Sequence, residues 1–177
     1  MNKKILIAYA GNYDSTKEIA QYIAVIINGM GGNAVTRSVD EIKGLAPYDA
    51  VIIGSAARMD KLLGKALRFA RRHADDLRQK TTAYFVTCIT MKKDTPENRE
   101  KAGSFLQPLC QIREPVGIGL FGGKLEYNKI GFLWKTLARQ DKTGSMAEGD
   151  FRDWEQIRAW AKEIGPKLIE SVESVLS

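Results

Sequence analysis

The sequence predicts an α/β fold in which a parallel β-sheet is covered on both faces by helices. Two observations lead to this prediction. Short apolar runs alternate with stretches whose apolar residues recur at helical spacing, and 44% of the 177 residues are hydrophobic. Such alternation favours parallel strands, because a crossover helix returns the chain to the same end of the sheet. A chain of this length can bury one sizeable core, so we expect residues 1–177 to form a single domain.

The strands and the first helices are predicted in alternation. The expected strands are residues 4–9, 34–38, 50–55, 82–87 and 116–121. The first helix follows the first strand, and a group of glycines ends it. Its apolar residues at helical spacing are Ile19, Ala20, Ile23, Ile26 and Ile27, and the glycines are Gly29, Gly31 and Gly32. Further helices are expected over residues 62–77 and 97–109.

A last helix is predicted over residues 153–164 and begins with a capping signal. Asp153 is followed three residues later by Gln156, which is the spacing of a capping box. Gly165-Pro166 comes next, and because proline lacks a backbone donor and clashes with the preceding turn, we expect a kink or a restart there. Residues 122–150 exceed a minimal alternating fold and predict an inserted helix at about 129–139, followed by a polar loop.

The remaining composition favours a cytoplasmic protein without a metal site. No apolar run approaches the roughly 18 residues that span a bilayer, so we expect a cytoplasmic protein, free or peripherally attached to a membrane. Cys88 and Cys110 predict reduced thiols and not a disulfide framework. The one histidine, His73, cannot supply a His-rich metal site, and we expect it to be a solvated helix residue.

The net charge of +6 is unevenly distributed along the chain. Residues 58–101 contain twelve Lys/Arg and six Asp/Glu, and residues 124–142 contain five and two. From Glu148 onward, seven acidic residues face four basic ones. This asymmetry suggests an anionic partner or membrane surface, and ordinary solvated faces are the alternative explanation.

Ligands of open parallel sheets bind at the carboxyl ends of the strands, so the loop after strand one is the first candidate site. Free backbone N–H groups and the helix dipole favour an anion there, and hydroxyl and amide side chains add donors. The alternative is a plain helix cap by Asp14 or Ser15. No Walker lysine follows, which argues against a nucleoside triphosphate. The loop consists of Gly11, Asn12, Tyr13, Asp14, Ser15 and Thr16.

The loops after strands three and four complete the candidate site. Small residues in the first of them let a flat ring approach the backbone. One phosphate-type loop and two small or polar loops at the same edge together indicate a mononucleotide with a flat polar ring. The candidate residues are Ser55, Ala56, Ala57, Arg58 and Met59 after strand three, and Thr87, Cys88, Ile89, Thr90 and Met91 after strand four. For Cys88, burial as a small hydrophobe is favoured over redox chemistry.

These segments resemble the flavodoxin-domain family. YAGNYDSTKEIA is similar to the family's phosphate-loop signature, and VIIGSAARM with the following helix GKALRFARRH resembles its second flavin loop. The tail FRDWEQIRAWAKEI and the insertion LEYNKIGFLWKTL most resemble the branch containing the bacterial flavodoxin-type protoporphyrinogen oxidase, which passes electrons to quinone. The resemblance covers roughly residues 3–165.

The resemblance implies a flavodoxin-like fold of five parallel strands in the order 2-1-3-4-5 that binds FMN noncovalently. Residues 11–16 would hold the FMN phosphate, residues 55–59 would line one side of the isoalloxazine ring, and residues 87–91 would line the other. FMN would supply the redox chemistry, so no catalytic acid, base or nucleophile is expected.

Four basic residues flank the predicted ring loops: Arg58, Lys61, Lys92 and Lys93. Nearby cations stabilise a reduced, anionic flavin by about 1 kcal/mol each at moderate exposure. Electron-carrier flavodoxins are typically acidic, so we expect this protein to accept electrons more readily than such carriers do.

Asp14 stands where the family usually has glycine. Aspartate tolerates a positive φ, and we expect Asp14 to adopt one while its carboxylate points away from the phosphate or caps the helix. The phosphate site should then function but bind FMN more weakly, and Asp14→Gly should tighten binding.

The aromatic residues of the insertion have two interpretations. They could contact a porphyrin, a quinone or a membrane surface through residues 127–139, or they could pack as an amphipathic helix on the sheet edge. Trp154 and Trp160 of the last helix are expected to pack in the core or at its boundary. The apolar residues of the insertion are Tyr127, Ile130, Phe132, Leu133, Trp134 and Leu137.

Three functions are compatible with these patterns. The first is an FMN oxidoreductase of the protoporphyrinogen-oxidase type, with an anionic tetrapyrrole and a quinone as substrates. The second is a flavodoxin-type electron carrier that docks on an acidic redox partner. The third is a flavin-free nucleic-acid-binding module. Net charge alone supports the third, so no nucleic-acid partner is expected.

Overall fold

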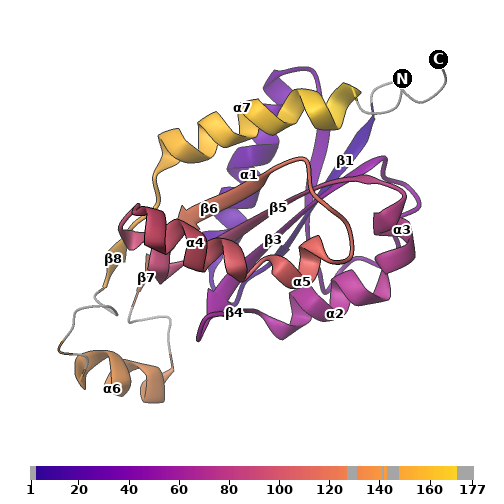
Figure 1. Ribbon diagram of the computed structural model, residues 1–177. Helices are drawn as coiled ribbons and strands as arrows, with labels where there is room; N and C mark the ends of the chain where they lie inside the picture. The colour runs from indigo at the N-terminus through magenta and orange to yellow at the C-terminus, as the bar shows by residue number, and fades with distance from the viewer. Residues whose placement is uncertain (1–2, 127–130, 141, 143–147, 171–177) are drawn as a thin grey trace.

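The computed structural model describes residues 3–126, 131–140, 142 and 148–170, and its centre is a parallel sheet between two layers of helices (Figure 1). The long strands lie in the order β2-β1-β3-β5-β6, and all their pairings are parallel. This is the predicted order 2-1-3-4-5, because the short strand β4 (Lys61–Leu62) pairs only with β3 and antiparallel to it. The long strands are β1 (Lys4–Ala10), β2 (Asn33–Ser38), β3 (Ala50–Arg58), β5 (Thr81–Cys88) and β6 (Ile118–Gly122).

The central strand β1 shows why the strands appear as continuous apolar runs in the sequence. Leu6 and Ala8 pack into the core on one face of the sheet, while Ile5 and Ile7 pack into the core on the other. All four side chains are fully buried, because helices cover both faces.

The helices are divided between the two faces. Helices α1 (Asp14–Gly29) and α7 (Trp154–Glu170) lie together on one face, where their isoleucines pack on the sheet (Figure 1). Trp160 is buried in this core and Trp154 packs against it, which confirms the predicted packing role of both tryptophans. The other face is covered by α2 (Gly64–Arg72), α3 (Ala74–Arg78), α4 (Pro96–Ser104) and α5 (Gln107–Cys110).

Two predicted helices are each divided in the structure. The helix expected over 62–77 is interrupted at His73, whose φ of −106° and ψ of 21° leave the helical range. The prediction of a solvated His73 is therefore wrong: its side chain is buried beside Phe69, with ring centroids 4.9 Å apart. The helix expected over 97–109 ends at Ser104, because Pro108 is tolerated only in the first turn of a new helix, α5.

The last helix is not divided, and it is longer than predicted. Asp153 accepts a hydrogen bond from the Gln156 N–H at 3.0 Å, which confirms the predicted start. However, α7 continues through Pro166 to Glu170 as one helix, so of the expected kink or restart, the restart is wrong. Pro166 faces solvent, so water can satisfy the freed carbonyl, while Ile164 and Leu168 remain buried in the core.

The insertion leaves the sheet through a two-stranded ribbon. Strand β7 (Lys124–Leu125) pairs antiparallel with β8 (Gly149–Asp150), and helix α6 (Phe132–Gln140) lies beyond them, apart from the sheet (Figure 1). Phe132 and Leu137 are 85% and 46% exposed, so these two side chains do not pack on the sheet edge. Tyr127, Ile130 and the side chains of Leu133 and Trp134 lie outside the described part of the structure.

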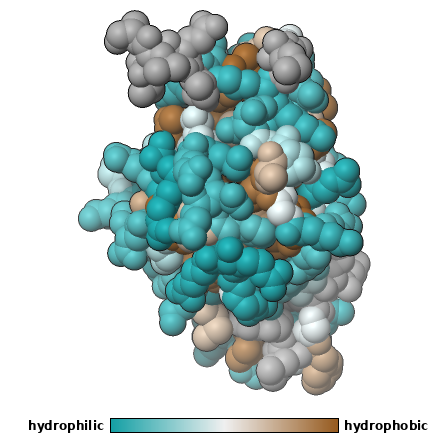
Figure 2. Space-filling model, turned by 90° about the vertical axis from the view of Figure 1, so that its right-hand side faces the viewer, coloured by the Kyte–Doolittle hydropathy of each residue, from teal (hydrophilic) through white to brown (hydrophobic). Residues whose placement is uncertain are grey.

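Figure 2 shows a side of the molecule that is mostly hydrophilic, with hydrophobic residues at its lowest part, at the height of α6 in Figure 1. Among the described helices, none is long and apolar enough to cross a membrane.

Candidate functional site

A cavity of about 450 Å³ lies at the carboxyl ends of β1, β3 and β5. Its walls come from the three loops that the sequence predicts, together with residues after β6 and the residues that flank α2 and α4, Leu63 and Phe105. The lining residues are Asn12, Tyr13, Ser15, Thr16, Ala56, Ala57, Arg58, Met59, Asp60, Leu63, Thr87, Cys88, Ile89, Thr90, Phe105, Gly123, Lys124 and Leu125.

Most of the predicted site residues therefore surround one space, and four do not line it: Gly11, Asp14, Ser55 and Met91. Met91 is buried in the core. Ser55 is fully buried, and its hydroxyl oxygen accepts from the Leu63 N–H at 3.3 Å, which supports the turn into α2. Ser55 and Met91 thus support the loops from behind.

The loop after β1 meets the N-terminus of α1 without a side-chain cap. Tyr13 is the N-cap residue, with an extended backbone (φ −134°, ψ 168°) and no capping hydrogen bond from its side chain. The alternative of a plain cap by Asp14 or Ser15 is therefore wrong. The backbone N–H groups of the first turn can bind an anion, which the helix dipole also favours.

The expectation of a positive φ at Asp14 is also wrong. In the described residues other than glycine, positive φ occurs only at Met59 and Asp60. Asp14 is instead the first helical residue of α1, exposed and outside the cavity. Asp14 lines a second, much smaller cavity beside the helix, and that its carboxylate points away from the phosphate stays a prediction.

The loop after β3 is a tight two-residue turn. Arg58 pairs with Lys61 across β3 and β4, and the turn residues Met59 and Asp60 have φ of 52° and 60°. Asp60 forms an ion pair with Lys101 at 2.9 Å, and Met59 is 78% exposed at the cavity rim. The turn therefore presents the Met59 side chain at the cavity mouth.

Two contacts join the loops to one another. The hydroxyls of Thr16 and Thr87 are hydrogen-bonded at 2.9 Å and buried. The Arg58 guanidinium lies over the Tyr13 ring, 5.9 Å from its centroid. The first loop is thus fixed to both of its neighbours.

Cys88 is buried in the cavity wall, as predicted for a small hydrophobe. Burial raises the pKa of its thiol, so the thiol stays protonated at neutral pH.

The sequence prediction missed the wall that follows β6. Gly123, Lys124 and Leu125 line the cavity, and the Lys124 N–H donates to the Ser15 hydroxyl at 3.1 Å. The signal was available, because GGKLE directly follows the fifth strand at the same sheet edge.

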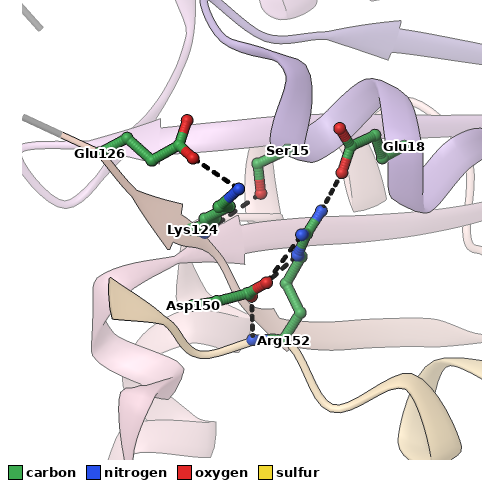
Figure 3. Close-up of polar contacts among 6 residues, drawn as sticks. All are labelled: Ser15, Glu18, Lys124, Glu126, Asp150 and Arg152. Atoms are coloured by element: carbon green, nitrogen blue, oxygen red, sulfur yellow. Dashed lines mark hydrogen bonds and ion pairs between the residues drawn. The ribbon is translucent and has the colours of Figure 1, made fainter. Parts of the chain in front are cut away.

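An ion-pair network surrounds this wall (Figure 3). The Lys124 ammonium pairs with Glu126 at 2.5 Å. The Arg152 guanidinium lies between Glu18 and Asp150, and only 6% of its side chain is exposed. Hydrogen bonding to Asp150 raises the pKa of Arg152, and the same contact lowers the pKa of Asp150. The network joins the base of the insertion to the first turn of α1.

The sequence model of a protein family described as the flavodoxin domain matches residues 6–150 of this chain. The chain belongs to the flavodoxin domain family. No curated protein matches this chain.

Solved structures agree with the fold at low sequence identity. Oxidised flavodoxin 1 from Bacillus cereus shares 18% identity at a TM-score of 0.60, over 96% of this chain and 99% of its own. The flavodoxin from Streptococcus pneumoniae TIGR4 shares 14% identity at a TM-score of 0.60, over 93% and 99%. The apo form of the NADH:FMN oxidoreductase EMOB shares 13% identity at a TM-score of 0.60, over 98% and 93%.

FMN is the cofactor of the flavodoxin domain family, and the site of this member fits it. The uncapped start of α1 offers backbone N–H groups to a phosphate, and Ala56 and Ala57 leave room for a flat ring. The cavity volume also lies in the range of small-molecule sites, roughly 300–1,000 Å³.

Proposed function

We propose that this flavodoxin-domain protein is an FMN-dependent oxidoreductase that oxidises an anionic tetrapyrrole of the protoporphyrinogen type and passes the electrons to a quinone. An enzymatic role is supported by the contribution of the insertion to the cavity. Lys124 and Leu125 of β7 line the cavity beside the loops that follow β1, β3 and β5. FMN supplies the electron-transfer chemistry when bound. The chain's own residues bind and orient the reactants.

The charges at the cavity mouth support an anionic substrate. The nearby acids Asp60 and Glu126 are each paired with a lysine, at 2.9 Å and 2.5 Å. Arg58 lines the cavity and lies over the Tyr13 ring, Lys61 pairs with Arg58 across β3 and β4, and Lys92 and Lys93 follow the lining residue Thr90 in the chain. The positive surplus would attract the carboxylates of a tetrapyrrole.

The test is an anaerobic assay of the FMN-loaded protein with protoporphyrinogen IX and a menaquinone analogue, followed by porphyrin fluorescence. We expect Lys61→Met/Lys93→Met to raise KM for the tetrapyrrole and to change kcat little, since these residues act in binding. Lys43→Met/Lys162→Met removes the same charge at exposed positions on segments that supply no residue to the cavity wall, the β2–β3 loop and α7, and should leave KM unchanged. Absence of oxidation by the FMN-loaded wild type would reject the proposal.

The second candidate function is that of an electron carrier that docks on an acidic redox partner. The same basic residues around the cavity favour this function. Electron shuttling between a reductase and an acceptor, with a rate that falls steeply as salt rises, would support this role. A protein that shuttles electrons but does not oxidise protoporphyrinogen is the carrier and not the enzyme.

Helix α6 is proposed as the contact with a membrane surface. Phe132 and Leu137 are exposed on a helix that also contains Lys135 and Arg139, a composition that suits an anionic bilayer. Cosedimentation with vesicles containing phosphatidylglycerol should therefore fall for Phe132→Ser/Leu137→Ser. Equal sedimentation of the variant and the wild type would reject this contact.

A further inference from the structure

Lys124 lies between the main cavity and the smaller cavity, and it was not predicted as a ligand from the sequence. Tyr13, Ser15 and Lys124 line both cavities. The smaller cavity is also lined by Asp14, Glu18 and Glu126. Among the described residues around this smaller cavity, Lys124 alone is positively charged.

This end of the site is crowded with negative charge. Asp14, Glu18, Glu126 and Asp150 supply four carboxylates around the start of α1, and Lys124 and Arg152 form ion pairs with the last three of them. Arg152 is held between Glu18 and Asp150 and is nearly buried, so it cannot turn toward a ligand without breaking both pairs (Figure 3). Arg152 is therefore not available to a phosphate that binds the N–H groups of the first turn of α1.

Lys124 is positioned to supply a positive charge to such a phosphate. Its backbone N–H donates to the Ser15 hydroxyl at 3.1 Å, which fixes the lysine one hydrogen bond from the anion-binding loop. Its side chain is 33% exposed, and its ammonium has three donors, of which one is directed at Glu126. The ammonium can keep Glu126 and donate to a phosphate oxygen as well.

We infer that Lys124 binds the phosphate group of the flavin and makes the site prefer FMN to riboflavin, with Ser15 as its positioning partner. Lys124 compensates for the carboxylates of Asp14 and Glu126, which explains how an anion site coexists with them. This inference rests on the FMN binding in the proposed function and adds the residue that recognises the phosphate.

The test measures the dissociation constants of FMN and riboflavin from the quenching of flavin fluorescence, at low salt. Lys124→Met should weaken FMN binding at least tenfold and change riboflavin binding less than twofold. Lys124→Arg keeps the charge and should retain most of the preference for FMN. Lys17→Met removes a charge from the exposed first turn of α1, outside both cavities, and should change both constants less than threefold.

Several results would overturn the inference. Equal weakening of both flavins in Lys124→Met would mean that the lysine only supports the fold, and unchanged FMN binding would mean that it does not touch the phosphate. A wild type that binds neither flavin, or both equally, would also overturn it. Because the assay measures binding alone, an FMN-loaded protein that leaves protoporphyrinogen unoxidised rejects the proposed reaction and not this role of Lys124.

Discussion

His73 is buried at the junction of α2 and α3, and its titration should make the protein less stable in mild acid. Its Nε2 atom is buried without a hydrogen-bond partner among the described residues, and its Nδ1 atom lies 4.0 Å from Asp76. Burial lowers the pKa of His73 below the ordinary 6.5, Asp76 opposes that effect, and Arg72 adds to it.

The sign of the pH effect follows from this lowered pKa. Below about pH 6.5, His73 is protonated more readily in the unfolded chain than in the folded chain. The free energy of unfolding therefore decreases as pH falls from 7.5 to 5.5. Urea denaturation across this range should show the decrease. His73→Leu should show a flatter profile, and a profile as steep as that of the wild type would assign the effect to other groups.

Asp14 should weaken FMN binding through its charge and not through its backbone. Because φ is not positive at this position, Asp14→Gly would also loosen the first turn of α1, and Asp14→Asn is the cleaner substitution. A charge pair at about 6 Å costs about 0.7 kcal/mol in a water-like dielectric, so FMN binding should tighten about threefold. Riboflavin titration is the control and should not change. Weaker FMN binding in Asp14→Asn would show that the carboxylate supports the site.

At the scale of elements, β3 and β5 can pair closely because residue 54 has no side chain. A Cβ atom at Gly54 would lie 2.0 Å from Cζ of Phe85, whose ring is fully buried and packs near Phe121 and Trp160. Gly54→Ala should therefore reduce the free energy of unfolding by about 2 kcal/mol, as measured by urea denaturation.

Two further variants test the cause of that loss. Gly54→Ala/Phe85→Leu should lose less stability than the sum of the single variants, because the smaller side chain relieves the clash. Gly103→Ala in α4 meets no atom within 4 Å, so it should leave stability unchanged or raise it. Additive losses in the double variant would contradict the contact between Gly54 and Phe85.

The strands could be predicted from sequence because burial on both faces makes them apolar throughout, as in β1. The break at His73 could not, because it accompanies the burial of His73 beside Phe69, whereas the break before Pro108 has a signal in the sequence, the proline itself, which the prediction overlooked. The positive φ of Met59 and Asp60 could not be predicted either, because the pairing of β3 with β4 imposes it, and methionine rarely adopts such a φ although aspartate tolerates it.

The candidate site, like the fold, could be predicted only in part from the sequence. The three loops were predictable because each directly follows a strand of the sheet, and together they supply most of the cavity wall. Lys124 also follows a strand at this edge and could have been predicted there, but its contact with Ser15 could not, because it joins residues 109 positions apart. Likewise, the capping roles expected of Asp14 and Ser15 ignored that contact.

At the scale of the whole molecule, the positive charge around the cavity should raise the reduction potential of bound FMN above that of acidic flavodoxins. Arg58 lines the cavity, Lys61 pairs with Arg58 across β3 and β4, and Lys92 and Lys93 follow the lining residue Thr90 by two and three positions. A unit charge about 10 Å from the ring contributes about 0.4 kcal/mol in a water-like dielectric. Reversing two such charges should therefore lower the potential by tens of millivolts.

Redox titration of FMN bound to Lys61→Glu/Lys93→Glu measures this shift. The matched variant Lys43→Glu/Lys162→Glu changes the net charge equally at exposed positions on segments that supply no residue to the cavity wall, and it should shift the potential less. The difference between the two variants should shrink in 1 M salt, because the screening length falls from about 10 Å at 0.1 M to about 3 Å. Equal shifts in both variants would mean that only net charge acts, and the location of the basic residues would then not explain electron acceptance.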